Sequence, residues 1–268
     1  SGMPFVPRTG AFFQYGIIAP YSLALFGDSM AWLGRTVNGS GAVYWMNGYS
    51  PEEISNPAVR WDIQQYEDRG DLSETIGWSY EREGHEFYVL SFPDANRTWV
   101  YDRLTNEWHE RGLWDVVTSD YLTYRPQFHA NAFGRNIVLD HSSGNVYALS
   151  STIYTDADGR GIRRMRQMPH VYADNRMLYF RHAELSCDGG TGLVGAGQGS
   201  DPTVVLQASN DGGKTWGNDR ERKTGKLGKY LTRVRWNQCG SARDRVWRLW
   251  SSDPVGTRWY NFTFEVGR

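Results

Sequence analysis

Short runs of apolar, aromatic and β-branched residues, separated by turn sequences, recur along the first 150 residues. They are Ala42–Trp45, Phe87–Ser91, Thr98–Asp102, Asn136–Asp140 and Val146–Leu149. Runs of this length, bounded by Gly, Asn, Asp or Ser, are typical of β-strands. Aligning Val43, Tyr88 and Ile137 gives steps of 45 and 49 residues. This spacing is close to the roughly 40–50 residues of one four-stranded propeller blade. The pattern predicts a mainly β, propeller-like fold, although a β-sandwich would also give short strands with regular turns.

One segment has helical spacing instead. Its apolar residues lie three or four positions apart and would share one helix face: Val59, Ile63 and Tyr66. Asn56 is a suitable N-cap, Pro57 is favoured at the first helical position, and Gly70 is a favoured stop. The sequence therefore predicts a single short helix around residues 57–69, inserted into the β-structure.

The C-terminal third also alternates between apolar and polar residues. Residues 230–236 and 260–266 both follow the two-residue period of a half-buried strand. Near residue 152 the blade-like pattern gives way to Arg-rich sequence. We expect one propeller-like β domain over residues 1–268, with a possible subdivision near residue 152.

Composition narrows the class of protein. Of the 268 residues, 40% are hydrophobic and 15% aromatic, which argues against disorder. No run approaches the roughly 18 apolar residues of a membrane-spanning helix, so we expect no membrane insertion. A charged leader followed by an apolar core, as in a signal peptide, is not visible at the start. The net charge of −1 argues against a general nucleic-acid binder.

Charge is unevenly distributed along the chain. Residues 52–120 carry a net charge of −10, whereas residues 214–248 carry +8. One interpretation is that both segments simply form solvated surfaces. The other is that the acidic and basic regions dock against partner proteins or against other copies of the chain. The candidate basic patch for partner contact consists of Arg160, Arg163, Arg164, Arg166, Arg220, Arg222, Lys223, Lys226 and Lys229.

The most specific local motif is an Asp box, Ser-x-Asp-x-Gly-x-Thr-Trp. Its members are Ser209, Asp211, Gly213, Thr215 and Trp216. Short polar side chains that bond to nearby backbone and a permissive glycine predict a structural turn, with the tryptophan packed beneath it. Asp boxes are familiar from sialidases, but this chain has one box and lacks the Phe/Tyr-Arg-Ile-Pro motif. A sialidase-like site is therefore the weaker alternative.

No other pattern indicates catalysis or a bound cofactor. The six histidines are scattered without metal-ligand spacing. Residues 195–199 do not complete a GxGxxG loop, and residues 156–159 match only the first part of a calcium loop. We predict no catalytic residue, no metal and no cofactor.

Several segments, taken in order, resemble a known family. They are Gly16–Ser22, Ile54–Val59, His85–Pro93, Thr98–Asp102, Asn106–Arg111, the Asp box, Gly225–Tyr230, Thr232–Trp236 and Ser241–Arg248. This ordered set resembles bacteriophage virion proteins of the packaged-DNA stabilisation type, which form part of the tail hub or nozzle of short-tailed phages. The resemblance covers nearly the whole chain.

The resemblance implies a non-enzymatic structural role in the virion, after synthesis in the host bacterial cytoplasm. It implies a ring of copies of the chain, for which sixfold symmetry is one arrangement. It also implies attachment to the portal and adaptor, retention of packaged DNA with possible DNA contact, and mounting of tail appendages. Because family members are usually longer, we expect this chain to be the C-terminal part of a longer protein. The other alternative is a carbohydrate-binding tail module that recognises the host.

Overall fold

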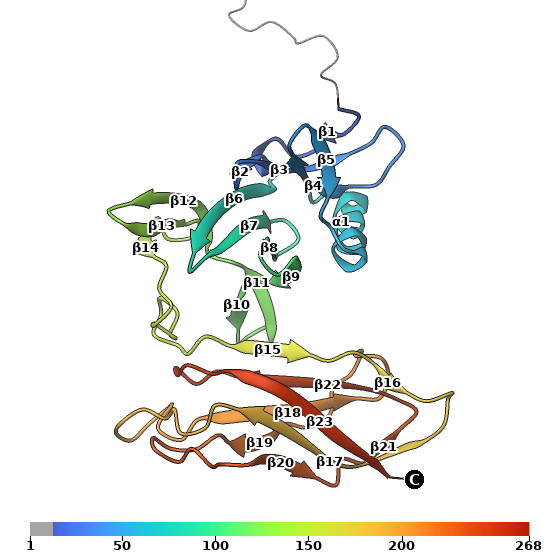
Figure 1. The fold of residues 1–268 in the computed structure, drawn as a ribbon, viewed down its shortest axis with the longest axis vertical. Coiled ribbons are helices and arrows are strands. Elements are labelled where there is room, and N and C mark those ends of the chain that lie inside the picture. Colours follow the sequence, from blue (N-terminus) through green and yellow to red (C-terminus); the bar gives the residue numbers. More distant parts are fainter. Residues whose placement is uncertain (1–12, 268) are drawn as a thin grey trace, which may run out of the picture. The chain divides into compact units, whose positions relative to one another are not determined.

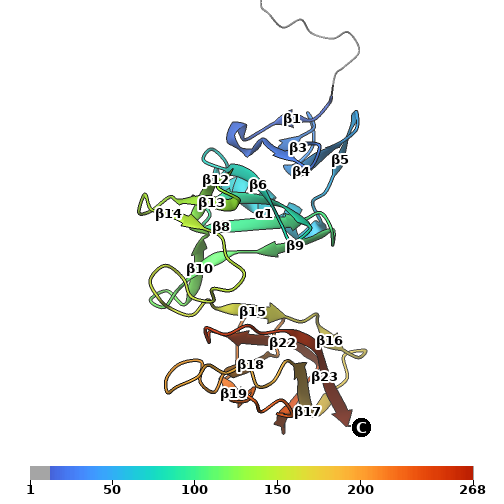
Figure 2. The same ribbon diagram turned by 60° about the vertical axis from the view of Figure 1, so that its left-hand side comes forward.

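The computed structural model describes residues 13–267 and has two compact units that meet in sequence between Leu149 and Ser150. Both are built almost entirely of antiparallel strands (Figures 1 and 2). The prediction of a mainly β protein is confirmed. The sequence predicted one domain with a possible subdivision near residue 152, and the division between the units lies close to that position.

The first unit contains four antiparallel sheets, a 3-10 turn η1 (Pro20–Ser22) and the helix α1 (Pro57–Arg69). The first sheet consists of β1 (Gly16–Ile17), β2 (Ala24–Phe26), β3 (Ser29–Arg35), β4 (Ala42–Asn47) and β5 (Ser50–Glu53). The second is the meander β6 (Ile76–Arg82), β7 (His85–Phe92), β8 (Arg97–Asp102) and β9 (Glu107–Glu110). The others are the hairpin β10 (Gly112–Asp115) and β11 (Asp120–Thr123), and the sheet β12 (Pro126–Ala132), β13 (Arg135–Asp140) and β14 (Val146–Ala148).

The 45- and 49-residue repeat corresponds to real units of structure. Val43, Tyr88 and Ile137 lie on β4, β7 and β13, which are inner strands of three different sheets. Each repeat therefore marks one sheet, as expected for successive blades. The sheets have five, four and three strands rather than a uniform four.

Strand β7 is buried on both of its faces. Tyr88 and Leu90 belong to a core cluster that also includes Val43 of β4 and Ile63 of α1. Val89 points the other way, into a cluster with Val138 of β13. Successive strand residues face opposite sides, so the β6–β9 sheet is packed on each face by a different neighbour.

The predicted helix is confirmed in its bounds and its caps. The Asn56 side-chain oxygen accepts a hydrogen bond from the Val59 amide at 2.9 Å. Gly70 ends the helix with φ +82°, a left-handed conformation that glycine adopts without strain. Its buried residues are Val59, Ile63 and Tyr66, as the apolar spacing predicted. This is the single α-helix among residues 13–267.

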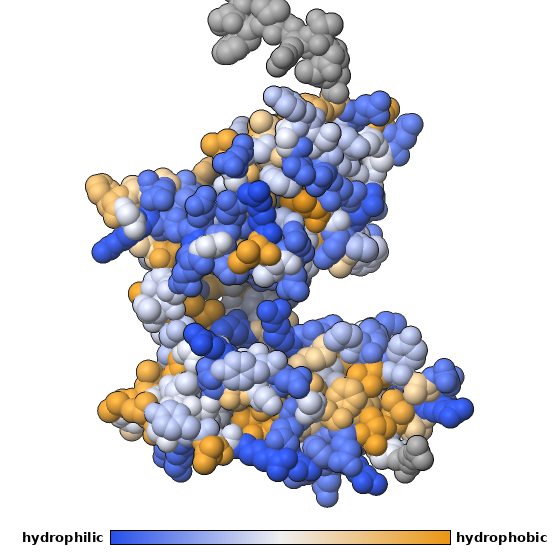
Figure 3. Space-filling model, viewed as in Figure 1, coloured by the Kyte–Doolittle hydropathy of each residue, from blue (hydrophilic) through white to orange (hydrophobic). Residues whose placement is uncertain are grey.

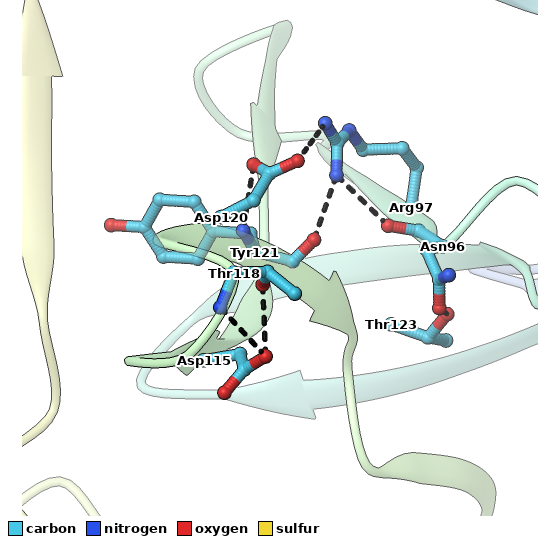
Figure 4. Close-up of polar contacts among 7 residues, drawn as sticks. All are labelled: Asn96, Arg97, Asp115, Thr118, Asp120, Tyr121 and Thr123. Atoms are coloured by element: carbon cyan, nitrogen blue, oxygen red, sulfur yellow. Dashed lines mark hydrogen bonds and ion pairs between the residues drawn. The ribbon is translucent and has the colours of Figure 1, made fainter.

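An arginine fixes the β10–β11 hairpin to the meander (Figure 4). The Arg97 guanidinium of β8 donates to the Tyr121 carbonyl at 2.8 Å and to the Asp120 carboxylate at 3.3 Å. At the hairpin turn, Asp115 accepts hydrogen bonds from the amide and the hydroxyl of Thr118. These contacts all lie at the turn end of the hairpin, where Asp115 pairs with Asp120 and Arg97 fixes the turn to the meander.

The second unit is a sandwich of two sheets. One sheet has the order β15 (Arg164–Gln167), β22 (Asp244–Ser251), β18 (Thr203–Ser209) and β19 (Arg220–Lys223), and β16 (Val171–Tyr172) also pairs with β22. The other has the order β20 (Val234–Asn237), β17 (Leu178–Cys187) and β21 (Ser241–Ala242), and β23 (Trp259–Gly267) also pairs with β17. Their facing side chains form one core around Phe180, Leu206, Trp236 and Trp247.

The two strands predicted in the C-terminal third have different outcomes. The strand predicted over residues 260–266 is confirmed as β23. The strand predicted over residues 230–236 is wrong for its first four residues, because β20 begins at Val234. A turn takes their place, in which the Thr232 hydroxyl donates to the Lys229 carbonyl at 2.9 Å. Leu231 is fully exposed there.

Among residues 13–267, no helix has the length and apolar character needed to cross a membrane.

Candidate functional site

The Asp box forms the turn after β18. Ser209 donates its hydroxyl to the Asp211 carboxylate at 2.6 Å and accepts the Gly213 amide at 2.8 Å. The same carboxylate accepts the amide and the hydroxyl of Thr215 at 2.9 and 2.5 Å. Gly212 and Gly213 have φ values of +77° and +91°, where a side chain would be strained.

These contacts have an electrostatic consequence. Hydrogen bonds from Ser209 and Thr215 hold the pKa of Asp211 well below its ordinary value, because they favour the ionised carboxylate. Asp211 is therefore fully occupied as a turn-forming acceptor. The arrangement is that of a structural element and leaves no reactive group in the turn.

Two arginines of β22 connect the Asp-box turn to the sandwich. The Arg248 guanidinium lies 3.8 Å from the centre of the Trp216 ring and donates to the Gln207 side chain at 2.6 Å. Arg245 donates to the Asn210 side chain at 2.7 Å. The half-buried Trp216 is therefore covered by a cation.

Arg245 is a buried cation that sequence reasoning did not single out. It is 3% exposed, donates to the Cys239 carbonyl at 2.8 Å, and lies 4.7 Å from the ring centres of Phe180 and Trp247. Burial lowers its pKa. Arg245 and Trp247 lie two residues apart on β22, which places them on the same, inward face. The carbonyls that accept from Arg245 belong to Cys239 and Ser241, just before β22, so a local pattern could have indicated this position.

The nine predicted basic residues do not form one patch. Arg160, Arg163, Arg164 and Arg166 lie on or just before β15, whereas Arg220, Arg222 and Lys223 form part of β19. Lys226 and Lys229 lie in the loop after β19. Because β15 and β19 are opposite ends of the strand order β15–β22–β18–β19, the two groups occupy opposite edges of one sheet.

Several of these basic residues stabilise the sandwich. Arg164 donates to the carbonyls of Asp253 and Val255 at 2.5 and 2.7 Å and to the Thr257 hydroxyl at 3.0 Å. Burial lowers its pKa. Arg163 lies 3.8 Å from the ring centre of Trp250. Both side chains on the β15 edge are therefore engaged within their own unit.

The β19 edge shows the same engagement. Arg220 donates to the Asn237 carbonyl, and Arg222 donates to the Arg235 carbonyl at 2.8 Å. Because β19 and β20 belong to different sheets, these bonds join the two layers at an edge. Lys223 donates to the Asp201 carbonyl at 3.3 Å.

The side chains of three of the nine cations make no hydrogen bond or ion pair with residues 13–267: Arg166, Lys226 and Lys229. All three are exposed. Arg160 is also exposed but pairs with Asp158 at 3.4 Å. The basic residues available to an external partner are thus fewer than the sequence suggested.

Apolar side chains accompany the two lysines. Leu227, Tyr230 and Leu231 are 57%, 71% and 100% exposed, and Val194 of the neighbouring glycine-rich loop is 88% exposed. Gly190 packs against Tyr230 and Gly192 against Leu227, so the two loops contact each other. Figure 3 shows hydrophobic residues gathered at both ends of the drawn face of this unit.

No group of three or more potential metal-ligating side chains is found in the part of the chain that the structure describes. The predictions about catalysis and cofactors therefore remain predictions.

Comparison with solved structures gives only weak similarities. One is a glycoside hydrolase family 43 arabinoxylan arabinofuranohydrolase from Bacillus subtilis, with 8% identity, 94% of this chain covered and a TM-score of 0.26. Another is an exo-beta-1,3-galactanase from Phanerochaete chrysosporium, with 8% identity, 91% of this chain covered and a TM-score of 0.19. The chain spans 55% and 56% of their lengths. Scores this low support no inference.

No curated protein matches the chain. Two family models match successive parts of the chain. The model described as bacteriophage P22 Gp10, beta-propeller, matches residues 1–154, and the model described as bacteriophage P22 Gp10, beta-sandwich, matches residues 163–267. These ranges correspond to the two units of the structure, and the propeller-like prediction for the fold is confirmed. The chain belongs to the P22 Gp10 family of bacteriophage tail structural proteins, as its sequence motifs suggested.

Proposed function

We propose that this chain is part of the tail hub or nozzle of a short-tailed phage. In this role it attaches to the portal and adaptor, helps to retain packaged DNA and provides a mount for tail appendages. The observation that carries the proposal is the succession of two Gp10 family domains over almost the whole chain. A structural family also favours a non-enzymatic role over the sialidase-like alternative.

A conditional-expression experiment tests this role directly. Phage particles assembled without the protein should package DNA and then lose it, and they should lack the tail parts that lie beyond it. Supplying the protein during assembly should restore both. Particles that keep their DNA and their complete tails in its absence would contradict the proposal.

The proposed assembly is a ring in which unlike surfaces of neighbouring copies meet. Support comes from opposite charge: residues 52–120 carry −10, whereas Lys226 and Lys229 are exposed cations without partners in the described chain. A chain that carries both kinds of surface can associate head to tail. The DNA could also contact the exposed cations, since phosphates attract them.

Charge reversal tests the electrostatic contact. The double variant K226E/K229E should weaken ring formation, and the defect should be larger at low salt, where screening is weak. Native mass over a micromolar concentration series is the measurement. Arg220 and Arg222 are left intact because they hold the two sheets together. A ring unchanged by the double variant at every salt concentration would exclude this contact.

A further inference from the structure

A cleft of about 240 Å³ opens on the β6–β9 sheet of the first unit. Its lining comes from three strands, the β6–β7 turn and the residue after β9: Tyr80, Arg82, Glu83, His85, Phe87, Asp102 and Arg111. Neither the Asp box nor the basic residues discussed above contribute to it. Nothing in the proposed tail role uses it.

One wall of the cleft is a histidine held in a fixed orientation. His85 Nδ1 lies 2.7 Å from the carboxylate of Asp102, which is 7% exposed and also accepts the Leu104 amide at 3.0 Å. Although burial raises the pKa of Asp102, these hydrogen bonds lower it below its ordinary value. The ionised carboxylate therefore keeps the proton on Nδ1. His85 Nε2 has no partner among residues 13–267.

The cleft is also lined by an arginine without a counter-ion, Arg111. Arg111 Nη1 donates to the Tyr80 hydroxyl at 2.5 Å, and Nε donates to His109 at 3.2 Å. The guanidinium also lies 5.1 Å from the ring centre of Phe87. No carboxylate of the described residues lies within ion-pair distance of it. The guanidinium is therefore immobilised, while its charge remains unneutralised and Nη2 remains unbonded.

The aromatic residues support these groups and are not free to stack on a ligand. Phe87 stacks on His85 at 5.7 Å with an interplanar angle of 6°, and on Tyr80 at 4.9 Å with an angle of 22°. Both neighbours are thus fixed by the same ring. A second arginine, Arg82, lines the cleft and lies 3.6 Å from the exposed carboxylate of Glu83. Two arginines and a histidine therefore converge on a volume suited to a small group.

We propose that this cleft binds a phosphoryl group, with donors from Arg111 and Arg82 and a proton shared with His85 Nε2. Preoriented guanidinium groups match the tetrahedral oxygens of phosphate, and the imidazole can exchange a proton with such an oxygen. Two acidic groups also line the cleft: Glu83 pairs with Arg82, and Asp102 holds the Nδ1 side of His85. The phosphoryl group can come from free phosphate or from a phosphomonoester such as a nucleoside monophosphate.

Titration calorimetry of the whole chain with inorganic phosphate, at constant ionic strength, tests the site. We expect saturable binding in the millimolar range, weakened about tenfold or more in Arg111→Met, since a charge-assisted contact is lost. Arg82→Met should weaken binding several-fold without lowering the melting temperature, because the ion pair of Arg82 is with an exposed carboxylate. This second variant keeps the test valid if loss of Arg111 disturbs the fold.

Arg135→Met is the matched control. Arg135 is an exposed arginine on β13 of the same unit, it lies outside the cleft, and it has no ion pair in the described chain. Its variant should bind phosphate as the parent does. No saturable heat at millimolar phosphate, or an equal loss in all three variants, would overturn the proposal. Thymidine monophosphate distinguishes the sources: tighter binding than phosphate indicates a phosphomonoester, and equal binding indicates free phosphate.

Discussion

The two units of the chain differ in how far apart their paired strands lie in sequence. In the β6–β9 meander and the β12–β14 sheet, every strand pairs with its sequence neighbour. In the sandwich, β15 pairs with β22, and β17 pairs with β20, β21 and β23. Strand propensity and hydrophobic periodicity are read over about ten residues. They therefore predict pairing between neighbouring strands much better than pairing between strands that are distant in sequence.

The units also differ in charge. Residues 1–149 contain 18 acidic and 10 basic residues, a net charge of −8, whereas residues 150–268 contain 12 acidic and 19 basic residues, a net charge of +7. In the sandwich, Arg164, Arg222 and Arg245 bond to carbonyls, and Arg163 lies over an aromatic ring. The positive net charge of this unit therefore comes partly from arginines that stabilise the sandwich internally, and only partly from side chains that are available to a partner.

The largest expected effect tests whether the units are stabilised separately. Trp236 is fully buried in the sandwich core, and its indole donates to the Arg220 carbonyl at 2.6 Å. Trp236→Ala should lower the free energy of unfolding of that unit by about 3–5 kcal/mol. Differential scanning calorimetry should show the sandwich transition shifted and the other transition unchanged. Trp61→Ala, at a 64% exposed position on α1, is the control. A single transition that shifts as a whole would show that the units unfold together.

The next effect separates structural arginines from surface arginines on one strand. The side chain of Arg164 makes three hydrogen bonds to the 253–257 segment, whereas the side chain of Arg166, two residues away, makes none in the described chain. Arg164→Gln should destabilise the sandwich by about 1.5–3 kcal/mol, the usual range for a hydrogen-bonded charge. Arg166→Gln should change stability by less than about 0.5 kcal/mol. Equal midpoints in urea for the two variants would show that the bonds of Arg164 contribute nothing.

The smallest effect concerns acid stability. The pKa of Asp211 in the folded protein lies below the value of about 3.9 for an unfolded aspartate. Its stabilisation is therefore present above about pH 4 and is lost as pH falls from there towards the folded pKa. Asp211→Asn should lower the melting temperature of the sandwich at neutral pH, and the difference from the parent should shrink in acid. A difference that stays constant down to pH 2 would contradict this linkage.

The helix and the blade repeat could be predicted because their causes are local. Asn56 caps the helix three residues from its hydrogen-bond donor, and Gly70 ends it with its own backbone conformation. The Asp-box turn is equally local, since Ser209 and Thr215 bond to the same aspartate. Each of these features can be recognised within a short window of sequence.

The remaining features depend on register and on sheet order. His85 reaches Asp102 because Phe87 pairs with Asp102 across β7 and β8, and Arg111 reaches Tyr80 across the meander. Similarly, the basic residues separate because the strand order places β15 and β19 at opposite edges. Strand propensity gives neither the register nor the strand order. The cleft and the separation of the basic residues could therefore be recognised only from the structure.

The pairing of β23 with β17 has a consequence for how the chain acquires its structure during synthesis. The β6–β9 meander has all its strands once residue 110 has left the ribosome. By contrast, β17 lacks a partner over Leu185–Cys187 until β20 and then β23 emerge, the latter ending at Gly267. Until then the backbone of β17 over Leu185–Cys187 has no paired strand on either edge. Translation therefore produces the strands of the first unit before the β17 sheet of the second unit is complete. Unpaired strand edges promote aggregation, so the nascent chain is most exposed to aggregation, and most in need of chaperones, at this stage.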